Sequence, residues 1–177
     1  LLTDWSESRF RPDIVCVNDQ VGADITHKAW PDISMDNIKI TGYPSLDKYK
    51  YYNAVDIAAK TRQIFNLEPA KPIVLYCGQV GRAGEALQEV VAVLNELKRD
   101  IYFISRQHPR MATDAPDQMS FWQAALDDFR GGILIRDTSA FETASLLALA
   151  DVVLAMYSTI LIEAAVLRKQ SIAVLYP

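Results

Sequence analysis

Short apolar runs alternate with amphipathic helical stripes from about Pro72 onward, and this alternation constrains the fold more than any other feature of the chain. The run Ile73–Gly78 is almost wholly apolar and ends in glycine, as expected of a strand buried on both faces of a sheet. The segment after it carries apolar residues at spacings of three and four, which predicts a helix with one buried stripe made of Ala83, Ala86, Leu87, Val90, Val91, Leu94 and Leu97.

Further strand-like runs follow, each separated from the next by a helical segment. The strand-like runs cover 101–105, 132–137, 151–156 and 171–176, and the helical segments cover 121–129, 143–150 and 159–167. Five strands with intervening helices predict a parallel α/β sheet of the Rossmann-like type, with right-handed crossovers and helices on both faces. Ligands of such sheets bind beyond the carboxyl ends of the strands, so the functional residues are expected in the loops 78–84, 106–110, 136–141 and 157–159.

The amino-terminal part of the chain follows a different pattern. Residues 1–43 hold two strand ends with a helix between them and are expected to be the end of a first Rossmann-like domain. Residues 44–69 contain Pro44, several tyrosines and a helical segment, which is typical of an interdomain linker. Residues 70–177 would then form a second Rossmann-like domain, truncated at its carboxyl end. Because the chain begins at Leu1 and its last strand-like run stops at the final residues, we expect both ends to be cut from a longer protein.

Composition narrows the functional classes. The net charge is −4, and no run of Lys or Arg supplies the basic footprint of a nucleic-acid-binding protein. The two cysteines, Cys16 and Cys77, lie in apolar runs and are expected to be buried thiols; with only His27 and His108 beside them, they favour neither a disulfide framework nor a metal site. No apolar stretch reaches the roughly 18 residues of a membrane span, since Asp151 interrupts the longest. A reducing, cytoplasmic setting fits best.

Three glycines lie directly between the first strand and its helix. Gly78, Gly81 and Gly84 form the spacing G-x-x-G-x-x-G, with Gln79 and Arg82 between them. Glycine lets backbone N–H groups approach a phosphate, and a helix start adds a favourable dipole. The spacing matches neither the dinucleotide fingerprint nor the phosphate loop of nucleoside triphosphatases. A phosphate-binding loop and a merely tight turn therefore remain alternatives.

A histidine between two arginines follows the second strand. His108 lies between Arg106 and Arg110, and Pro109 restricts the local backbone. This arrangement at the carboxyl end of a strand suits a phosphate, and it could stabilise a departing phosphate. The alternative is an ordinary solvated polar loop.

The turn after the fourth strand is the most informative segment. Ser158 and Thr159 open a helix that is apolar except for Glu163. Glu163 stands five residues after Ser158 and four after Thr159, so it does not have the spacing of a capping box. A carboxylate in such surroundings requires a partner, and a ribose diol offers two hydroxyl donors. The hydroxyls and free N–H groups at the helix start could take a diphosphate. The alternatives are a capping role for the hydroxyls and a structural acid satisfied by backbone.

With these residues in view, residues 147–177 resemble the donor-binding end of glycosyltransferases of the two-Rossmann-domain (GT-B) architecture. They also resemble the non-hydrolysing UDP-N-acetylglucosamine 2-epimerases that share this fold. The common pattern is an aspartate that opens a strand, a serine-rich turn and a glutamate on the next helix, and it is matched here by Asp151, Ser158, Thr159 and Glu163.

Two shorter motifs extend the resemblance over nearly the whole chain. Thr41–Asp47 resembles the TG-x-P-x-x-D that closes the first domain in this group, and the sequence His-Pro-Arg at 108–110 resembles an element of capsule, CDP-glycerol and bacterial sialyl transferases. The chain departs from the epimerases at Ser158-Thr159-Ile160, where they have Ser-Gly-Gly, and at Gly78–Arg82, which lacks their histidine. It also lacks the paired-acid-glycine motif of the sialyltransferases. These departures count against epimerase activity.

The resemblance implies a metal-independent glycosyltransferase that binds and transfers a sugar from a nucleotide-sugar donor, without a cofactor. Residues 70–177 would be the nucleotide-sugar-binding domain, and helix dipoles and basic side chains would stabilise the leaving diphosphate. No catalytic residue is assigned, because the base usually lies in the first domain. The expected donor-binding residues are Gly78, Gln79, Arg82, Arg106, His108, Arg110, Thr138, Phe141, Ser158, Thr159 and Glu163.

Three alternatives stay open: a non-hydrolysing sugar-nucleotide 2-epimerase, a CDP-polyol phosphotransferase and a non-catalytic nucleotide-sugar-binding domain. The expected partners are the nucleotide-sugar donor and the missing N-terminal domain of the same chain, with no nucleic acid and no transmembrane segment; a homodimer is left open. The expected location is the cytoplasm, with a peripheral position at the inner membrane face as an alternative. Because the first domain is mostly missing, these 177 residues alone are expected to be inactive.

Overall fold

The computed structural model describes residues 11–176. Residues 1–10, which belong to the expected first-domain segment 1–43, and residue 177 lie outside the described part. The chain divides into two compact units, Leu1–Lys50 and Tyr51–Pro177. This division falls within the segment 44–69 that the sequence suggests as a linker. Each unit is described below by itself.

The first unit is a small parallel β-α-β arrangement. Strand β1 (Val15–Val17) pairs with β2 (Ile38–Ile40), and α2 (Gln20–Ala29) connects them, followed by the short helix η1 (Met35–Asn37). The helix α2 begins where the Asp19 carboxylate accepts a hydrogen bond from the Gly22 N–H at 2.7 Å. Ala23, Ile33 and Ile38 form the buried centre of this unit. A second short helix, η2 (Pro44–Tyr51), ends at the boundary between the units.

Cys16 corrects one expectation from the sequence. Its thiol is exposed, although its apolar run predicted burial. Val15 and Val17, its neighbours in β1, pack against the core of the unit and are half-buried. Since alternate residues of a strand point to opposite faces, Cys16 points away from that core.

The second unit is built on a five-stranded parallel sheet with the strand order β5-β4-β3-β6-β7. The strands are β3 (Ile73–Cys77), β4 (Ile101–Arg106), β5 (Gly132–Ile135), β6 (Val152–Ala155) and β7 (Gln170–Ala173). This confirms the expected fold class. The last strand begins one residue earlier and ends three residues earlier than its apolar run, because it is an edge strand that pairs with only four residues of β6.

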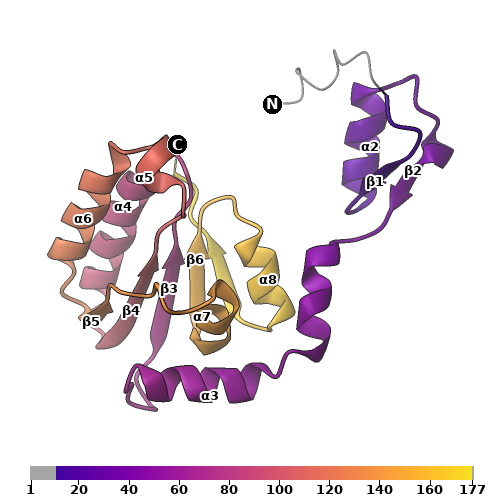
Figure 1. The fold of residues 1–177 in the computed structure, drawn as a ribbon. Helices are drawn as coiled ribbons and strands as arrows, with labels where there is room; N and C mark the ends of the chain where they lie inside the picture. Colours follow the sequence, from indigo (N-terminus) through magenta and orange to yellow (C-terminus); the bar gives the residue numbers. More distant parts are fainter. Residues whose placement is uncertain (1–10, 177) are drawn as a thin grey trace. The chain divides into compact units, whose positions relative to one another are not determined.

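Helices cover both faces of this sheet (Figure 1). On one face lie α4 (Ala83–Glu96), α5 (Met111–Asp114) and α6 (Gln118–Asp128), and on the other lie α7 (Thr143–Leu149) and α8 (Ile160–Val166); α3 (Ala54–Ile64) packs against α7. Alternate side chains of β3 point to opposite faces of the sheet. Tyr76 packs in the hydrophobic core beneath α4 and α6, whereas Leu75 and Cys77 pack in the core beneath α7 and α8. Burial on both faces explains why these strands read as continuous apolar runs.

Helix α3 packs along α7 within this unit. The rings of Phe65, at the end of α3, and Phe141, before α7, stack with centroids 4.3 Å apart. The Tyr102 hydroxyl of β4 accepts a hydrogen bond from the Glu68 N–H at 3.1 Å. Helix α3, which lies within the segment 44–69, is therefore part of the packed second unit, whereas most of η2 belongs to the first.

Asp151 has a structural role at the amino ends of the strands. Its carboxylate accepts a hydrogen bond from the Ile73 N–H at 2.8 Å, and its own N–H donates to the Ile73 carbonyl at 2.9 Å. The aspartate that opens a strand thus ties the start of β6 to the start of β3, at the edge opposite to the loops expected to bind ligand.

Within residues 11–176, no helix combines the length and the apolar character that crossing a membrane requires.

Candidate functional site

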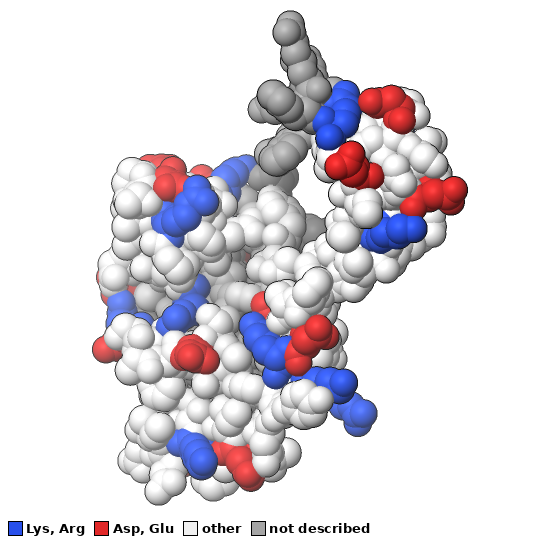
Figure 2. Space-filling view, turned by 45° about the vertical axis from the view of Figure 1, so that its right-hand side comes forward, with Lys and Arg blue, Asp and Glu red and all other residues white. Residues whose placement is uncertain are grey.

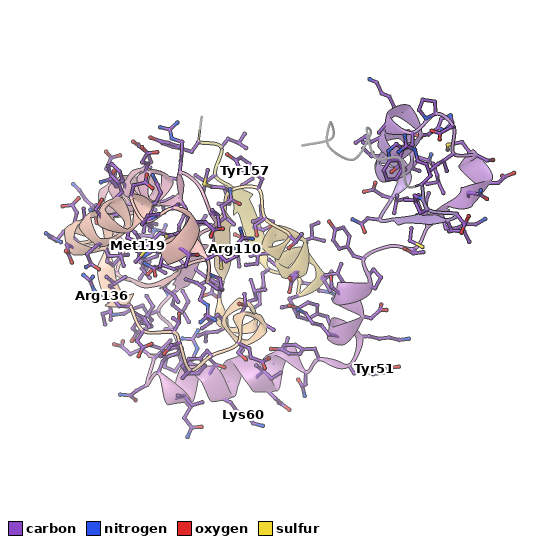
Figure 3. All side chains as sticks on the ribbon, turned by 45° about the horizontal axis from the view of Figure 1, so that its top comes forward. Tyr51, Lys60, Arg110, Met119, Arg136 and Tyr157 are labelled. Atoms are coloured by element: carbon purple, nitrogen blue, oxygen red, sulfur yellow. The ribbon has the colours of Figure 1, made fainter. Side chains whose placement is uncertain are left out.

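The strand order brings four loops to one edge of the sheet. All five strands run parallel, so the loops after β3, β4, β5 and β6 leave from the same carboxyl edge. Successive strands are added on one side of β3 as far as β5, and the chain then returns to the other side of β3 with β6. The point where strand order reverses therefore lies between β3 and β6, and this is where ligands of doubly wound sheets bind. Figure 3 labels Arg110 after β4, Arg136 after β5 and Tyr157 after β6.

The glycines of the β3–α4 loop have different surroundings. A side chain at Gly78 would place its Cβ 2.4 Å from the Trp122 ring, and one at Gly84 would place it 2.3 Å from the Gln118 carbonyl oxygen. Both glycines therefore allow close packing against α6. Gly81 has a φ of +106° and no heavy atom within 4 Å of its hypothetical Cβ, so there glycine serves the backbone conformation.

The amino end of α4 is already occupied by protein groups. The Gln118 side-chain oxygen accepts hydrogen bonds from the N–H groups of Gly84 and Glu85, at 3.1 and 3.4 Å. Arg82, which precedes the helix, forms an ion pair with Glu85, and its guanidinium carbon lies 4.5 Å from the centroid of the Tyr176 ring. No pattern in the sequence indicated Gln118, because the contact joins residues 34 positions apart.

Arg106 connects the loops that follow β4 and β5. Its guanidinium donates hydrogen bonds to the carbonyl oxygen of Thr138 and, at 3.2 Å, to the Thr138 hydroxyl. Thr138 is buried and Arg106 is half-buried. Two of the predicted residues thus contact each other directly, and part of the hydrogen-bonding capacity of Arg106 is used within the protein.

His108 and Arg110 are held by a tight turn before α5. The Arg110 N–H donates to His108 Nδ1 at 3.2 Å, and this assignment leaves Nε2 as the protonated nitrogen of the neutral ring. The Arg110 guanidinium forms an ion pair with Asp114 one helical turn later. Hydrogen bonds from Arg110 and Thr113 hold the pKa of the Asp114 carboxyl below its usual value. Arg110 is therefore directed toward its own helix, whereas His108 is half-buried beside Arg106.

A cavity of about 400 Å³ lies outside the ends of β4 and β5. Its polar lining includes Arg106, His108, Arg136, Asp137 and Thr138, and Trp122 contributes apolar surface. Arg136 forms an ion pair with Asp127 at 2.7 Å. Arg136 and Asp137 were not among the donor-binding residues predicted from the sequence, although their loop, 136–141, was. The position of an arginine directly after the third predicted strand could have indicated Arg136.

The β6–α8 turn lies on the other side of β3. The Ser158 hydroxyl accepts a hydrogen bond from the Ile160 N–H at 3.3 Å, and the Thr159 carbonyl accepts one from the Glu163 N–H at 3.0 Å. Thr159 is exposed and makes no capping bond through its side chain. Ser158 and Glu163 are half-buried. The Ser158 hydroxyl thus contacts the first residue of α8, whose N-cap residue is Thr159.

Cys77 is buried at the carboxyl end of β3, where it pairs with Arg106 of β4 on one side and Ala155 of β6 on the other. Burial raises the pKa of this thiol to about 12, the nearby Arg106 guanidinium lowers it, and the Glu163 carboxylate raises it. Since Cys77 is the last residue of β3, Arg106 and Glu163 lie on either side of the carboxyl end of this strand.

The predicted residues therefore fall into distinct groups. Arg106, His108 and Thr138 line the cavity. Ser158, Thr159 and Glu163 belong to the β6–α8 turn, and Gly78, Gln79 and Arg82 to the β3–α4 loop, with Gln79 half-buried. Phe141 packs on Phe65. Whether they bind a donor together stays a prediction.

Charges of both signs are mixed on the face of the molecule drawn in Figure 2. Ion pairs join Arg110 to Asp114 and Arg136 to Asp127. Across the described part of the chain, no group of three or more His, Cys, Asp or Glu side chains is placed to hold a metal ion.

A scan against protein families matched residues 4–176 to the family described as CDP-glycerol:poly(glycerophosphate) glycerophosphotransferase. None of the curated proteins compared with the chain matched it. The resemblance to the GT-B and epimerase group agrees with this family match. It also agrees with the solved structures to which the chain is similar.

One such structure is a variant of the wall teichoic acid polymerase TagF soaked with CDPG, with 17% identity, a TM-score of 0.57, and coverage of 96% of this chain and 41% of that one. Another is the UDP-GlcNAc 2-epimerase from Neisseria meningitidis bound to UDP-GlcNAc, with 18% identity, a TM-score of 0.58, and coverage of 81% and 40%. A third is a glycosyltransferase from Rickettsia africae, with 12% identity, a TM-score of 0.56, and coverage of 97% and 47%. These likenesses show the fold, and the chain spans less than half the length of each of these proteins.

Proposed function

The chain belongs to the CDP-glycerol:poly(glycerophosphate) glycerophosphotransferase family, and from this premise we propose that the full-length protein is a metal-independent GT-B-type transferase that uses a donor activated by a nucleotide diphosphate. The family description favours the CDP-polyol donor, one of the alternatives that the sequence leaves open, over the sugar donor that the resemblance implies. The second unit would bind the donor, and the N-terminal domain of the same chain would complete the site.

The observation that carries this proposal is that Arg106 and His108 follow β4 and Glu163 follows β6, the two strands that flank β3 at the carboxyl edge of the sheet. A nucleoside diphosphate needs cationic groups that bind its phosphates and hydrogen-bond acceptors that bind its ribose hydroxyls. Arg106 and His108 offer the first on the β4 side, and Glu163 offers the second on the β6 side. Both kinds of group therefore lie at the edge of the sheet where ligands of this fold class bind.

The transfer of glycerol phosphate from a CDP-glycerol donor suggests a role for each of these groups. A hydroxyl of the acceptor attacks the phosphorus that bears the glycerol, the bond from this phosphorus to the bridging oxygen breaks, and CMP leaves. Negative charge accumulates on the leaving phosphate, so the Arg106 guanidinium and the Nε2–H of His108 would stabilise the transition state more than the ground state. The base that accepts the proton of the attacking hydroxyl would come from the first domain, and no cofactor is required.

The test is a comparison of donors with the purified full-length protein. CDP-glycerol and UDP-N-acetylglucosamine would be incubated separately, each with and without a poly(glycerophosphate) acceptor, and CMP and UDP would be quantified. Acceptor-dependent release of CMP supports the proposal, and acceptor-dependent release of UDP would support a sugar transferase instead. Conversion of UDP-N-acetylglucosamine to its 2-epimer without acceptor would contradict both, and binding of donors without any turnover would indicate a non-catalytic binding domain.

The same proposal covers location and assembly. A cytoplasmic protein, whether free or peripheral at the inner membrane face, would have access to nucleotide-activated donors and would keep its thiols reduced. The proposed donor site lies within one chain, so the proposal applies equally to a monomer and to a homodimer.

A further inference from the structure

The start of helix α4 stands where many α/β proteins bind a phosphate, directly after the first strand of the sheet. Here its first-turn N–H groups already have acceptors. The Ala83 N–H donates to the Gly81 carbonyl at 2.8 Å, and the N–H groups of Gly84 and Glu85 donate to the Gln118 side-chain oxygen at 3.1 and 3.4 Å. Gln118 is 5% exposed, and its amide nitrogen donates to the Asp117 carboxylate at 3.2 Å, so the orientation of its amide is fixed.

Close packing seals the space around this helix start. A Cβ at Gly84 would lie 2.3 Å from the Gln118 carbonyl oxygen and 2.9 Å from the Phe121 Cβ, and a Cβ at Gly78 would lie 2.4 Å from the Trp122 ring. A phosphate is far larger than a methyl group, so it does not fit between α4 and α6 at either glycine. Gly81 alone among these three glycines faces open space.

We propose that Gln118 is a positioning residue that takes the place of an anion at the start of α4 and fixes the helix start that follows the loop 78–82, so that a donor diphosphate meets this loop at Gly81 rather than at the helix start. The side-chain oxygen satisfies the positive end of the helix without a charge. A neutral amide leaves the neighbouring loop attractive to a phosphate, whereas a bound anion would repel one. The part that concerns the diphosphate rests on the proposed function; the role of Gln118 as the cap of α4 does not.

The experiment compares three variants of the full-length protein. Gln118→Met keeps the length of the side chain and removes the accepting oxygen, and Gln118→Glu restores an oxygen at the same place. Gln88→Ala, an exposed glutamine on α4, is the matched control. Hydrogen exchange of the Gly84 and Glu85 amides is measured for each protein, and CDP and cytidine are titrated by calorimetry into wild type, Gln118→Met and Gln88→Ala.

Gln118→Met is expected to speed exchange of both amides at least about tenfold, and Gln118→Glu to restore protection, because the oxygen is what protects them. Affinity of Gln118→Met for CDP should fall about tenfold while that for cytidine stays within about twofold, since only CDP carries the diphosphate. Gln88→Ala should behave as wild type in both measurements.

Other results would overturn the inference. Unchanged exchange in Gln118→Met would remove the capping role. Equal losses for CDP and cytidine would mean general damage rather than positioning, and tighter binding of CDP would mean that the helix start is an anion site that Gln118 merely blocks. A wild type that binds no CDP would contradict the proposed function and the diphosphate part of the inference together, while the exchange data would still decide whether Gln118 caps α4.

Discussion

Gly84→Ala tests the packing of α4 against α6 because two physical effects oppose each other at this position. In an unobstructed helix, replacing glycine by alanine gains up to about 1 kcal/mol of stability. At Gly84, however, the new methyl group would lie 2.3 Å from the Gln118 carbonyl oxygen and 3.0 Å from the Trp122 nitrogen. Both are backbone atoms of a helix, so no side chain can rotate away, and α4 and α6 must separate.

The expected magnitude follows from the balance of these effects. Overpacking typically costs about 1–3 kcal/mol, and a clash with backbone belongs at the upper end of this range. Subtracting the gain in helix propensity of about 1 kcal/mol leaves a net destabilisation of about 2 kcal/mol. Separating the helices would also lengthen the hydrogen bonds from Gly84 and Glu85 to Gln118, so the loss of stability should begin at this end of α4.

Gly22→Ala is the matched control. Gly22 also lies in a helix, α2, but its hypothetical Cβ has no neighbour closer than 3.4 Å, which is ordinary contact. This variant should gain about 0.5 kcal/mol. Native-state hydrogen exchange at peptide resolution reports the opening of α4 and of α2 separately, so the two units need not unfold together. If Gly84→Ala matched Gly22→Ala and stabilised its helix, the argument from close packing would be refuted.

Further predictions concern the ligand, the thiols and the isolated chain. His108→Ala should weaken binding of a nucleoside diphosphate by roughly 1–3 kcal/mol but leave nucleoside binding nearly unchanged; calorimetry showing equal losses would reject a phosphate role for His108. Glu163→Gln should lower affinity for a ribonucleotide roughly tenfold or more and barely affect the 2′,3′-dideoxy analogue, because a charged acceptor is worth about 1.5–3 kcal/mol; parallel losses in a titration of both, together with a lower melting temperature, would favour a structural acid. In the native protein at pH 8, iodoacetamide should modify Cys16, which is exposed, and spare Cys77, whose pKa burial raises to about 12, so that it carries almost no thiolate until the pH approaches that value; mass spectrometry showing modification of Cys77 at the rate of Cys16 would contradict this. The 177 residues alone should transfer no group from a nucleotide-activated donor to an acceptor, and robust transfer measured by release of nucleotide would exclude the need for a further domain.

The sequence predicted the elements of the second unit well because their signal is local. A strand buried on both faces must be apolar along its whole length, as Ile73–Cys77 is, and a helix packed on a sheet must repeat its apolar residues every three or four positions, as α4 does. Such patterns lie within a dozen residues and need no knowledge of what packs against them. The same rule misjudged Cys16, since an apolar run does not say whether one or both faces of its strand are covered.

The site depended on neighbours that are distant in the sequence. Its four loops could be named from the positions of the strand ends, and Arg106 and Glu163 do lie on either side of β3. The same spacing of glycines can allow a phosphate or a helix to approach the backbone. Only the position of α6 shows that Trp122 packs against Gly78 and the Gln118 backbone against Gly84.

By itself, the sequence determined the alternation of strands and helices, their apolar faces and the loops in which chemistry is to be sought, because burial imposes a periodic pattern on each element. Only the tertiary structure decided the strand order β5-β4-β3-β6-β7, the link from Arg106 to Thr138 and the cap that Gln118 provides for α4. Each of these depends on which elements become neighbours, and the pairing of elements leaves no periodic trace in the residues that make it.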